Sequence, residues 1–420
     1  MSSHSMNEML SGLDDMRPRL TDFYQDLHRH PELSMQENRT AAEAAEHLHG
    51  EGYEVTTGVG KTGVVAILDN GPGPMVMLRA DMDALPLREQ TELPYASSAT
   101  GTDPDGIEVP VMHACGHDMH VACMWGAASM LAVNRNRWSG RLMMVVQPGE
   151  EIAAGARAMI EDRIFDRFGK PTVILGQHVT PAPAGTLHWR SGVTMAAADS
   201  IEIRLFGRGA HGSRPQSSID PVVMAASLVM RLQTIVAREV SPTEQVVVTV
   251  GSIRAGTKEN IIPDEAFLKL NVRTFSTAVR EHVLDSIRRI ANAEASASNA
   301  PRPPEFRPLN SFPILSNDHD ATTHLASALS AHFGRERVHQ TPAVNASEDF
   351  GEFGTAAGVP SVFWYFGGLD YGLIRAAERA GGMDAIPGNH SPLFAPVIEP
   401  TLSTGVEALV AGALACLPAT

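Results

Sequence analysis

The residue types with the most chemical potential lie together in the segment His113-Ala-Cys115-Gly-His117-Asp118-Met-His120. A thiolate and an imidazole two residues apart, at a turn that glycine permits before a helix, can face one point. Cysteine and histidine are borderline-soft donors that suit zinc, and a helix N-terminus favours a deprotonated thiol. The segment therefore predicts a metal site, with a buried cysteine beside surface histidines as the alternative.

Two adjacent glutamates, Glu150 and Glu151, directly follow the apolar strand expected at Leu142–Val146. Neighbouring side chains at a strand end point in different directions, so one carboxylate can bind a metal ion while the other acts as a base. The same pair would also fit a solvated turn on the surface.

Two more histidines lie at comparable places. His178 follows the strand expected at Thr172–Leu175, and His390 lies in the polar loop Gly388-Asn389-His390-Ser391. A lone histidine is more often structural than a ligand. The prediction of a metal site therefore requires that the cysteine, the glutamates and these histidines come together in the fold, at the ends of strands.

The elements that must position these residues alternate between short apolar strands and helices. Helices are expected over residues 7–52 and 117–133, and strands over 63–68, 75–79, 142–146 and 172–175. This pattern predicts an α/β domain with a mixed, largely parallel sheet covered by helices on both faces. Ligands bind at the carboxyl ends of such strands, where Asp81, Glu150, Glu151 and His178 lie.

The pattern changes near residue 192. Strands are expected at 201–206, 246–250 and 266–272, and helices at 221–239, opened by Asp220 and Pro221, and at 279–297. This predicts an α+β domain with a four-stranded sheet and two helices. The proline-rich stretch 299–308 is expected to be a linker. The predicted domains are therefore a metal-binding catalytic domain, 1–192 and 308–420, and an inserted lid and dimerisation domain, 193–307.

Composition excludes several classes of protein. The net charge of -15 argues against nucleic acids and anionic membranes as partners. No apolar run reaches the roughly 18 to 20 residues that span a bilayer, and Met1–Met6 shows no secretory signal. The three cysteines form no disulfide framework, so a reducing cytoplasm is the expected location.

Five motifs follow one another along the chain: Leu78-Arg-Ala-Asp81-Met-Asp83-Ala-Leu-Pro86, His113–His120, Gln147–Glu151, Ala210-His211-Gly-Ser-Arg-Pro215 and Ser347-Glu348-Asp349-Phe350. In this order they resemble the motifs of the aminoacylase and carboxypeptidase family of dinuclear metallopeptidases. More narrowly, the chain is similar to the branch of hippurate hydrolases, auxin-conjugate hydrolases and N-acyl-L-amino acid amidohydrolases. The resemblance runs from about His28 to His390.

The resemblance implies two divalent metal ions per chain and Glu150 as general base. Zinc is the expected metal, with manganese, cobalt or nickel as alternatives. Asp81 stands where the wider family has a metal-binding histidine, a departure shared with the narrower branch, and we favour the Cys115 thiolate as the bridging ligand. Asp81, Asp83 and Asp118 are expected to orient ligand imidazoles, and His28 and His30 to be packing or loop residues. The implied ligands are Cys115, His117, Glu151, His178 and His390.

Three residues of the inserted domain are expected to bind the substrate. A guanidinium fork at Arg273 and an amide donor at Asn260 suit an α-carboxylate. Arg273 taken alone would more often be a surface cation, and it is the resemblance that favours a binding role. The family resemblance implies that His211 polarises the scissile carbonyl oxygen, often across a dimer, so a homodimer through the lid domain is expected.

Metal-dependent hydrolysis of the amide bond of N-acyl-L-amino acids is the predicted function. A dipeptidase or carboxypeptidase is the first alternative, although we can nominate no acceptor for a peptide's free α-amine. A thiol hydrolase with Cys115 as nucleophile would leave the glutamate pair unexplained. A non-catalytic metal- or metabolite-binding protein is a remote third alternative.

Overall fold

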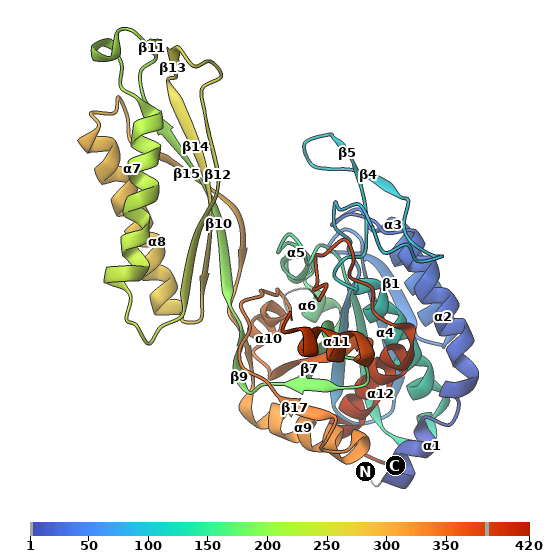
Figure 1. The fold of residues 1–420 in the computed structure, drawn as a ribbon. Coiled ribbons are helices and arrows are strands. Elements are labelled where there is room, and N and C mark those ends of the chain that lie inside the picture. The colour runs from blue at the N-terminus through green and yellow to red at the C-terminus, as the bar shows by residue number, and fades with distance from the viewer. Residues whose placement is uncertain (1–2, 383–385) are drawn as a thin grey trace. The chain divides into compact units, whose positions relative to one another are not determined.

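The structure, a computed structural model, describes residues 3–382 and 386–420 in two compact units (Figure 1). The first unit holds Met1–Gly192, Ser316–Pro342 and Asp349–Thr420, and the second holds Val193–Leu315 and Ala343–Glu348. Residues 1–2, within the segment considered for a signal, and residues 383–385, within the loop before His390, lie outside the described residues. The chain passes between the units at β9 (Gly192–Met195), at β16 (Leu315–Asn317) and on either side of Ala343–Glu348.

The first unit is built on an eight-stranded mixed sheet, as the strand pattern predicts. Its central strands β6, β3, β7 and β18 are parallel neighbours, and antiparallel pairs lie toward both edges. The strand order is β1 (Glu54–Val59), β2 (Gly63–Asn70), β6 (Gly140–Gln147), β3 (Met75–Asp81), β7 (Val173–Pro183), β18 (Ser361–Leu369), β8 (Leu187–Trp189) and β17 (Val338–Gln340). Because parallel strands share a direction, the carboxyl ends of β3 and β6 meet at one edge, with Asp81 beside Gln147.

Helices cover both faces of this sheet, which confirms the expected layers. One face carries α4 (His117–Val133), which is buried over nearly its whole length because it is apolar all round. Packed with α4 are α2 (Leu13–Arg29), α3 (Asn38–Gly50) and α12 (Ile398–Cys416), and α12 contacts α9 (His319–Phe333). The other helices are α1 (Ser3–Met9), α5 (Gly155–Glu161), α6 (Ile164–Phe168), α10 (Gly351–Ala357) and α11 (Tyr371–Ala380); a short hairpin joins β4 (Thr100–Thr102) to β5 (Glu108–Pro110).

The second unit is a four-stranded antiparallel sheet covered by two helices. The strand order is β12 (Val246–Ala255), β14 (Glu265–Thr274), β10 (Ala197–Phe206) and β15 (Glu305–Phe312). Burial alternates along β14 because one face packs against α7 (Pro221–Thr234) and α8 (Thr277–Ala297). Beyond the start of β14, β11 (Ala210–His211) and β13 (Ile261–Ile262) form a small ribbon (Figure 1).

The linker expected at 299–308 is wrong in its second half. From Glu305 the chain forms β15, the fourth strand of the sheet, and residues through Leu315 belong to the second unit. Proline is tolerated there because β15 is an edge strand and Pro308 lies at an irregularity in its pairing with β10. The density of prolines therefore marks an edge strand as well as a linker.

One helical segment, Pro221–Glu239, is long and apolar enough to cross a membrane by length and composition alone. It comprises α7 and a π-helical turn at Ile235–Glu239. Met224, Leu228 and Leu232 are buried against the sheet of the second unit, as in an amphipathic helix of a folded domain. Its other side exposes Val223 and Met230.

Candidate metal centre

Cys115 and His117 flank a glycine that shapes the start of α4. Gly116 has a φ of +84°, and a Cβ atom there would approach a Val179 methyl group to 2.4 Å. Only glycine fits such a close, left-handed turn. The turn brings both side chains to the carboxyl end of the sheet, where the Cys115 Sγ lies 3.4 Å from the Nε2 of His178.

The five residues expected as metal ligands form one connected cluster. Donor atoms of Cys115, His117 and Glu151 lie within 4.8 Å of one another. His178 contacts Cys115, and the Nε2 of His390 lies 3.3 Å from a Glu151 oxygen. His178 lies within β7 rather than after it, because β7 continues to Pro183 beside β18.

Two buried atoms of this cluster fit a cation. Among the described residues, the Nε2 of His117 and the Oε1 of Glu151 are buried without a hydrogen-bond partner. The Nδ1 of His178 donates to the Val179 carbonyl oxygen at 2.7 Å, so its Nε2 presents a lone pair toward Cys115. Burying polar atoms without a partner is costly, and a bound cation would remove that cost. Cysteine, histidine and glutamate together suit a divalent transition metal.

The surroundings of Cys115 disfavour ionisation of its thiol, although its place at a helix N-terminus led us to expect the opposite. Burial, and then the carboxylates of Glu151, Glu150 and Asp81, raise the pKa of the Cys115 thiol well above its usual value. These effects outweigh the helix N-terminus, because a second anion among buried carboxylates is unfavourable. Ionisation of Cys115 therefore requires a cation, which argues against an unassisted thiol nucleophile.

The His117 imidazole is held by the same carboxylates. Burial lowers its pKa, but Asp81, Asp83 and Glu151 outweigh burial and raise it to about 10. Metal binding must therefore displace a proton from His117 and will be favoured by rising pH.

Asp83 and Asp118, both expected to orient ligands, have different surroundings. Asp83 lies 3.2 Å from the Nδ1 of His117 and accepts the Glu151 N–H at 3.0 Å, so it contacts two of the expected ligands. Asp118 instead faces the Nδ1 of His28 at 2.6 Å. Asp118 therefore contacts a buried packing residue, and its role in orienting a ligand stays a prediction. His28 is buried, as a packing residue should be, whereas His30 is exposed.

Asp81 joins a buried network that sequence reasoning missed. One of its oxygens accepts from His120, whose Nε2 accepts the Val179 N–H at 2.8 Å. Both nitrogens of His120 are therefore occupied, so this histidine is unsuited to bind a metal. The other oxygen accepts from Arg79 at 2.5 Å, and Arg79 also reaches Asp349 at 3.1 Å. Asp81 thus hydrogen-bonds to His120, and it also lies 3.7 Å from the Nε2 of His117, an expected ligand.

The contacts of His28 predict a pH-dependent contribution to stability. Its two ring nitrogens face Asp118 at 2.6 Å and Glu89 at 3.1 Å, so both carry protons. Burial lowers the pKa of His28, but the two carboxylates outweigh it and raise the pKa from 6.5 to about 9.

A raised pKa stabilises the fold fully below pH 6.5, and this contribution is lost as the pH rises through 9. At its largest, this contribution to the free energy of unfolding is about 3 kcal/mol. Urea unfolding of metal-loaded wild type and His28→Gln should show a difference in unfolding free energy that shrinks across this window. A constant difference would contradict the assignment.

In the second unit, His211 and Asn260 lie on the same ribbon. His211 pairs with Ile261, and the Gly212 N–H donates to the Asn260 carbonyl at 2.8 Å. The Nδ1 of His211 accepts the Ser213 N–H at 3.1 Å, so in the neutral ring the proton is on Nε2. The exposed His211 side chain therefore presents an N–H donor.

Arg273 lies near the opposite end of β14 from this ribbon. Its Nε donates to Asn271 at 3.1 Å, and its Nη1 contacts the Asn345 carbonyl oxygen. Among the described residues no carboxylate pairs with Arg273, although its guanidinium is half-buried. Burial lowers its pKa, as expected for a cation without an anion beside it.

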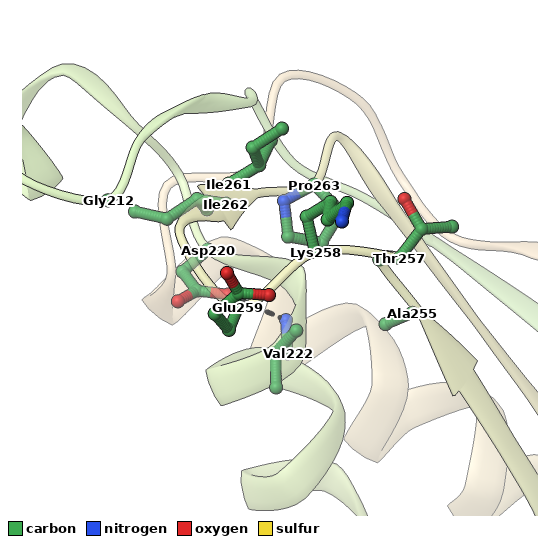
Figure 2. A pocket seen from close by; sticks show the side chains of 11 residues that line it. Gly212, Asp220, Val222, Ala255, Thr257, Lys258, Glu259, Ile261, Ile262 and Pro263 are labelled. Carbon is green, nitrogen blue, oxygen red and sulfur yellow. Dashed lines mark hydrogen bonds between the residues drawn. The ribbon is translucent and has the colours of Figure 1, made fainter.

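A pocket of about 480 Å³ lies beside the ribbon (Figure 2). Asp220 and Glu259 both line it, and Asp220 also caps α7 by accepting the Val222 N–H at 2.8 Å. Lys258 also lines the pocket, but the two carboxylates outnumber it, so we do not assign the substrate carboxylate to this pocket.

The mixed sheet and the Cys–His–Glu cluster at its carboxyl edge define a metal-dependent hydrolase. The chain belongs to the Peptidase family M20/M25/M40, whose profile matches residues 77–379.

The similarity to curated relatives and to a solved structure supports membership of this family. The chain is 38% identical to N-acetylcysteine deacetylase of Bacillus subtilis, over 79% of this chain and 84% of the relative. It is 37% identical to hippurate hydrolase of Campylobacter jejuni, over 81% and 86%, and 35% identical to thermostable carboxypeptidase 2 of Saccharolobus solfataricus, over 91% of each. A Bacillus subtilis structure described as a dinuclear metal binding peptidase from the M20 family has a TM-score of 0.73 and 31% identity, over 96% of this chain and 99% of that one.

Proposed function

We propose that this enzyme hydrolyses the amide bond of N-acyl-L-amino acids and releases a carboxylic acid and a free amino acid. The observation that carries the proposal is Arg273, a half-buried guanidinium without a carboxylate partner among the described residues. Such a fork suits the α-carboxylate of an amino acid whose amine is blocked. The similarity to a deacetylase and a hippurate hydrolase, both named for N-acyl amino acids, supports this substrate class.

Five residues would hold two divalent ions, and we propose zinc, with manganese, cobalt or nickel as alternatives. When bound, such ions polarise an amide carbonyl and lower the pKa of a water molecule. Their proposed ligands are Cys115, His117, Glu151, His178 and His390.

The remaining chemistry falls to Glu150 and His211. Glu150 takes a proton from the attacking water and delivers it to the departing amine, because an amide anion is a very poor leaving group. The Nε2–H of His211 donates to the carbonyl oxygen as negative charge develops there. Arg273 and Asn260 hold the substrate carboxylate.

Metal analysis combined with a substrate panel tests the function. The purified enzyme should hold about two divalent ions per chain. It should release amine from N-acetyl-L-cysteine or hippurate and lose this activity on chelation. Full activity in a metal-free sample would refute the metal mechanism and favour a thiol hydrolase. Faster cleavage of unblocked dipeptides than of any N-acyl amino acid would favour the dipeptidase or carboxypeptidase alternative.

Esterification of the substrate α-carboxylate should raise the transition-state free energy by about 2 to 4 kcal/mol, because Arg273 then lacks a charged partner. The Arg273→Ala variant should scarcely distinguish free from esterified substrate. The measurement is kcat/KM for both substrates with both enzymes. Arg204→Ala is a matched control, since that surface arginine on the neighbouring strand already pairs with Glu265 at 2.5 Å. Equal rates on both substrates with the wild-type enzyme would exclude the carboxylate site.

We also propose a homodimer formed through the second unit. The outer side of α7 exposes Val223 and Met230, and the edge strand β12 exposes Ile253. A twofold contact would cover apolar side chains and pair an open strand edge. The three free cysteines fit a reducing cytoplasm.

A further inference from the structure

The turn that carries Glu150 and Glu151 is unusually tight. Gly149 has a φ of +56°, and a Cβ atom there would lie 2.6 Å from the Met35 sulfur. At Gly155 a Cβ atom would lie 1.5 Å from the Pro148 carbonyl oxygen. The direction of both glutamate side chains therefore depends on what holds this short stretch of backbone.

Buried carboxylates hold the turn at three backbone N–H groups. The acceptors come from the start of α3, the segment after β3 and the segment before α10, and all three are inaccessible to solvent. The pairs are Gly149 N–H to Glu37 at 2.8 Å, Glu151 N–H to Asp83 at 3.0 Å and Ala156 N–H to Asp349 at 3.1 Å. Charge-assisted bonds of this kind are stronger than neutral ones and fix backbone geometry.

Glu37 is the one of these acceptors that holds the residue just before Glu150. Its Oε1 accepts the Gly149 N–H and also the Met35 N–H at 2.7 Å, and its Oε2 accepts the Thr62 hydroxyl at 2.6 Å. Burial, with Asp83 nearby, raises the pKa of Glu37 to about 7. Assays of its ionised form therefore belong above that pH.

We propose that Glu37 is a positioning residue that orients the Glu150 side chain by fixing the Gly149 N–H. This inference rests on the proposed role of Glu150 as general base. Without an acceptor at residue 37, the Gly149 amide is left unpaired and the turn can rotate. The Glu150 carboxylate then spends less time aligned with the attacking water.

A double-mutant cycle on metal-loaded enzyme tests this role. Glu37→Met keeps the side-chain volume and removes the acceptor, so it should lower kcat about tenfold and leave KM and metal content unchanged. In a Glu150→Gln background the same change should cost nothing further, because no base remains to be aligned. A loss of folded protein would instead lower activity equally in both backgrounds.

Two further variants serve as controls. Glu37→Gln retains an oxygen for the Gly149 N–H and should recover most of the wild-type kcat. Thr62→Val removes a hydrogen bond from the same carboxylate on the side away from the turn, and it should change kcat by less than about twofold. If Glu37→Met does not fold, Glu37→Asp replaces it in the cycle, since the shorter side chain withdraws the acceptor and keeps the charge.

Equal losses in both backgrounds, or a Thr62→Val variant as slow as Glu37→Met, would overturn the positioning role. Wild-type kcat in a folded variant without the acceptor would do the same. Failure of the proposed function gives a different result, because Glu150→Gln alone would then leave turnover unchanged.

Discussion

The Glu150→Gln variant is expected to retain its metal ions and its fold while turnover falls by roughly two to four orders of magnitude, the usual contribution of a positioned base. Glutamine has nearly the same shape as glutamate but cannot take a proton from water. Glu150 is buried and lies close enough to Cys115 to raise the pKa of that thiol. Because Glu150 is not one of the five proposed ligands, the substitution removes no metal–ligand bond and should leave the metal content unchanged.

Glu151→Gln is the matched control, one residue away on the same turn. One Glu151 oxygen is buried without a partner, and the other lies 3.3 Å from His390. Its loss should lower metal affinity first, and excess metal should restore part of the activity. Metal content by mass spectrometry and kcat at saturating metal separate the two variants. The opposite pattern, with metal lost from Glu150→Gln and retained by Glu151→Gln, would exchange base and ligand.

Four of the residues around the expected metal site could be proposed from the sequence because they lie beside the end of a strand or the start of a helix. Glu150 and Glu151 follow an apolar strand, and Cys115 and His117 flank the glycine that opens α4. Parallel strands align their carboxyl ends, so the position along a strand already indicates which side chains share an edge.

Contacts across the sheet were not predictable in the same way. Arg79 lies inside a fully buried strand and joins Asp81 to Asp349, which is 270 residues away from it in the sequence. Glu37 directly precedes a helix, and its buried carboxylate accepts the N–H of Gly149, 112 residues away in the sequence. Such partners depend on packing between elements, which periodicity does not encode. A buried acidic residue without a local partner gives little signal in one sequence.

The contact that Asp118 makes with His28 was missed for a related reason. Helical spacing places it beside His117, but successive residues on a helix point about 100° apart, so neighbours in sequence face different surroundings. Asp118 consequently faces His28 of α2, while Asp83 reaches His117. The prolines of β15 misled in another way, since an edge strand tolerates them.

The geometry of the second unit leads to the second prediction, which concerns the chain from which His211 acts. Asn260 and His211 share the ribbon before β14, whereas Arg273 is near the end of that strand. Glu265 and Arg273 are eight residue steps apart along an extended strand, which corresponds to roughly 27 Å. One carboxylate cannot contact Asn260 and Arg273 of the same unit across that length. If both bind one substrate, they come from different chains, and His211 accompanies Asn260.

Mixed dimers are therefore expected to recover activity from two inactive variants. Glu150→Ala and His211→Ala should each be nearly inactive alone. When they are refolded together in equal amounts, about half the dimers should be mixed, and each mixed dimer has one site with Glu150 and the partner's His211 both intact. Total activity should then reach about a quarter of wild type. Tagging the two variants differently and purifying the doubly tagged dimer shows that mixing took place. A site formed within one chain can regain nothing, because no chain carries both residues. Inactive mixed dimers would mean that His211 acts together with Glu150 of its own chain, or that it takes no part in catalysis.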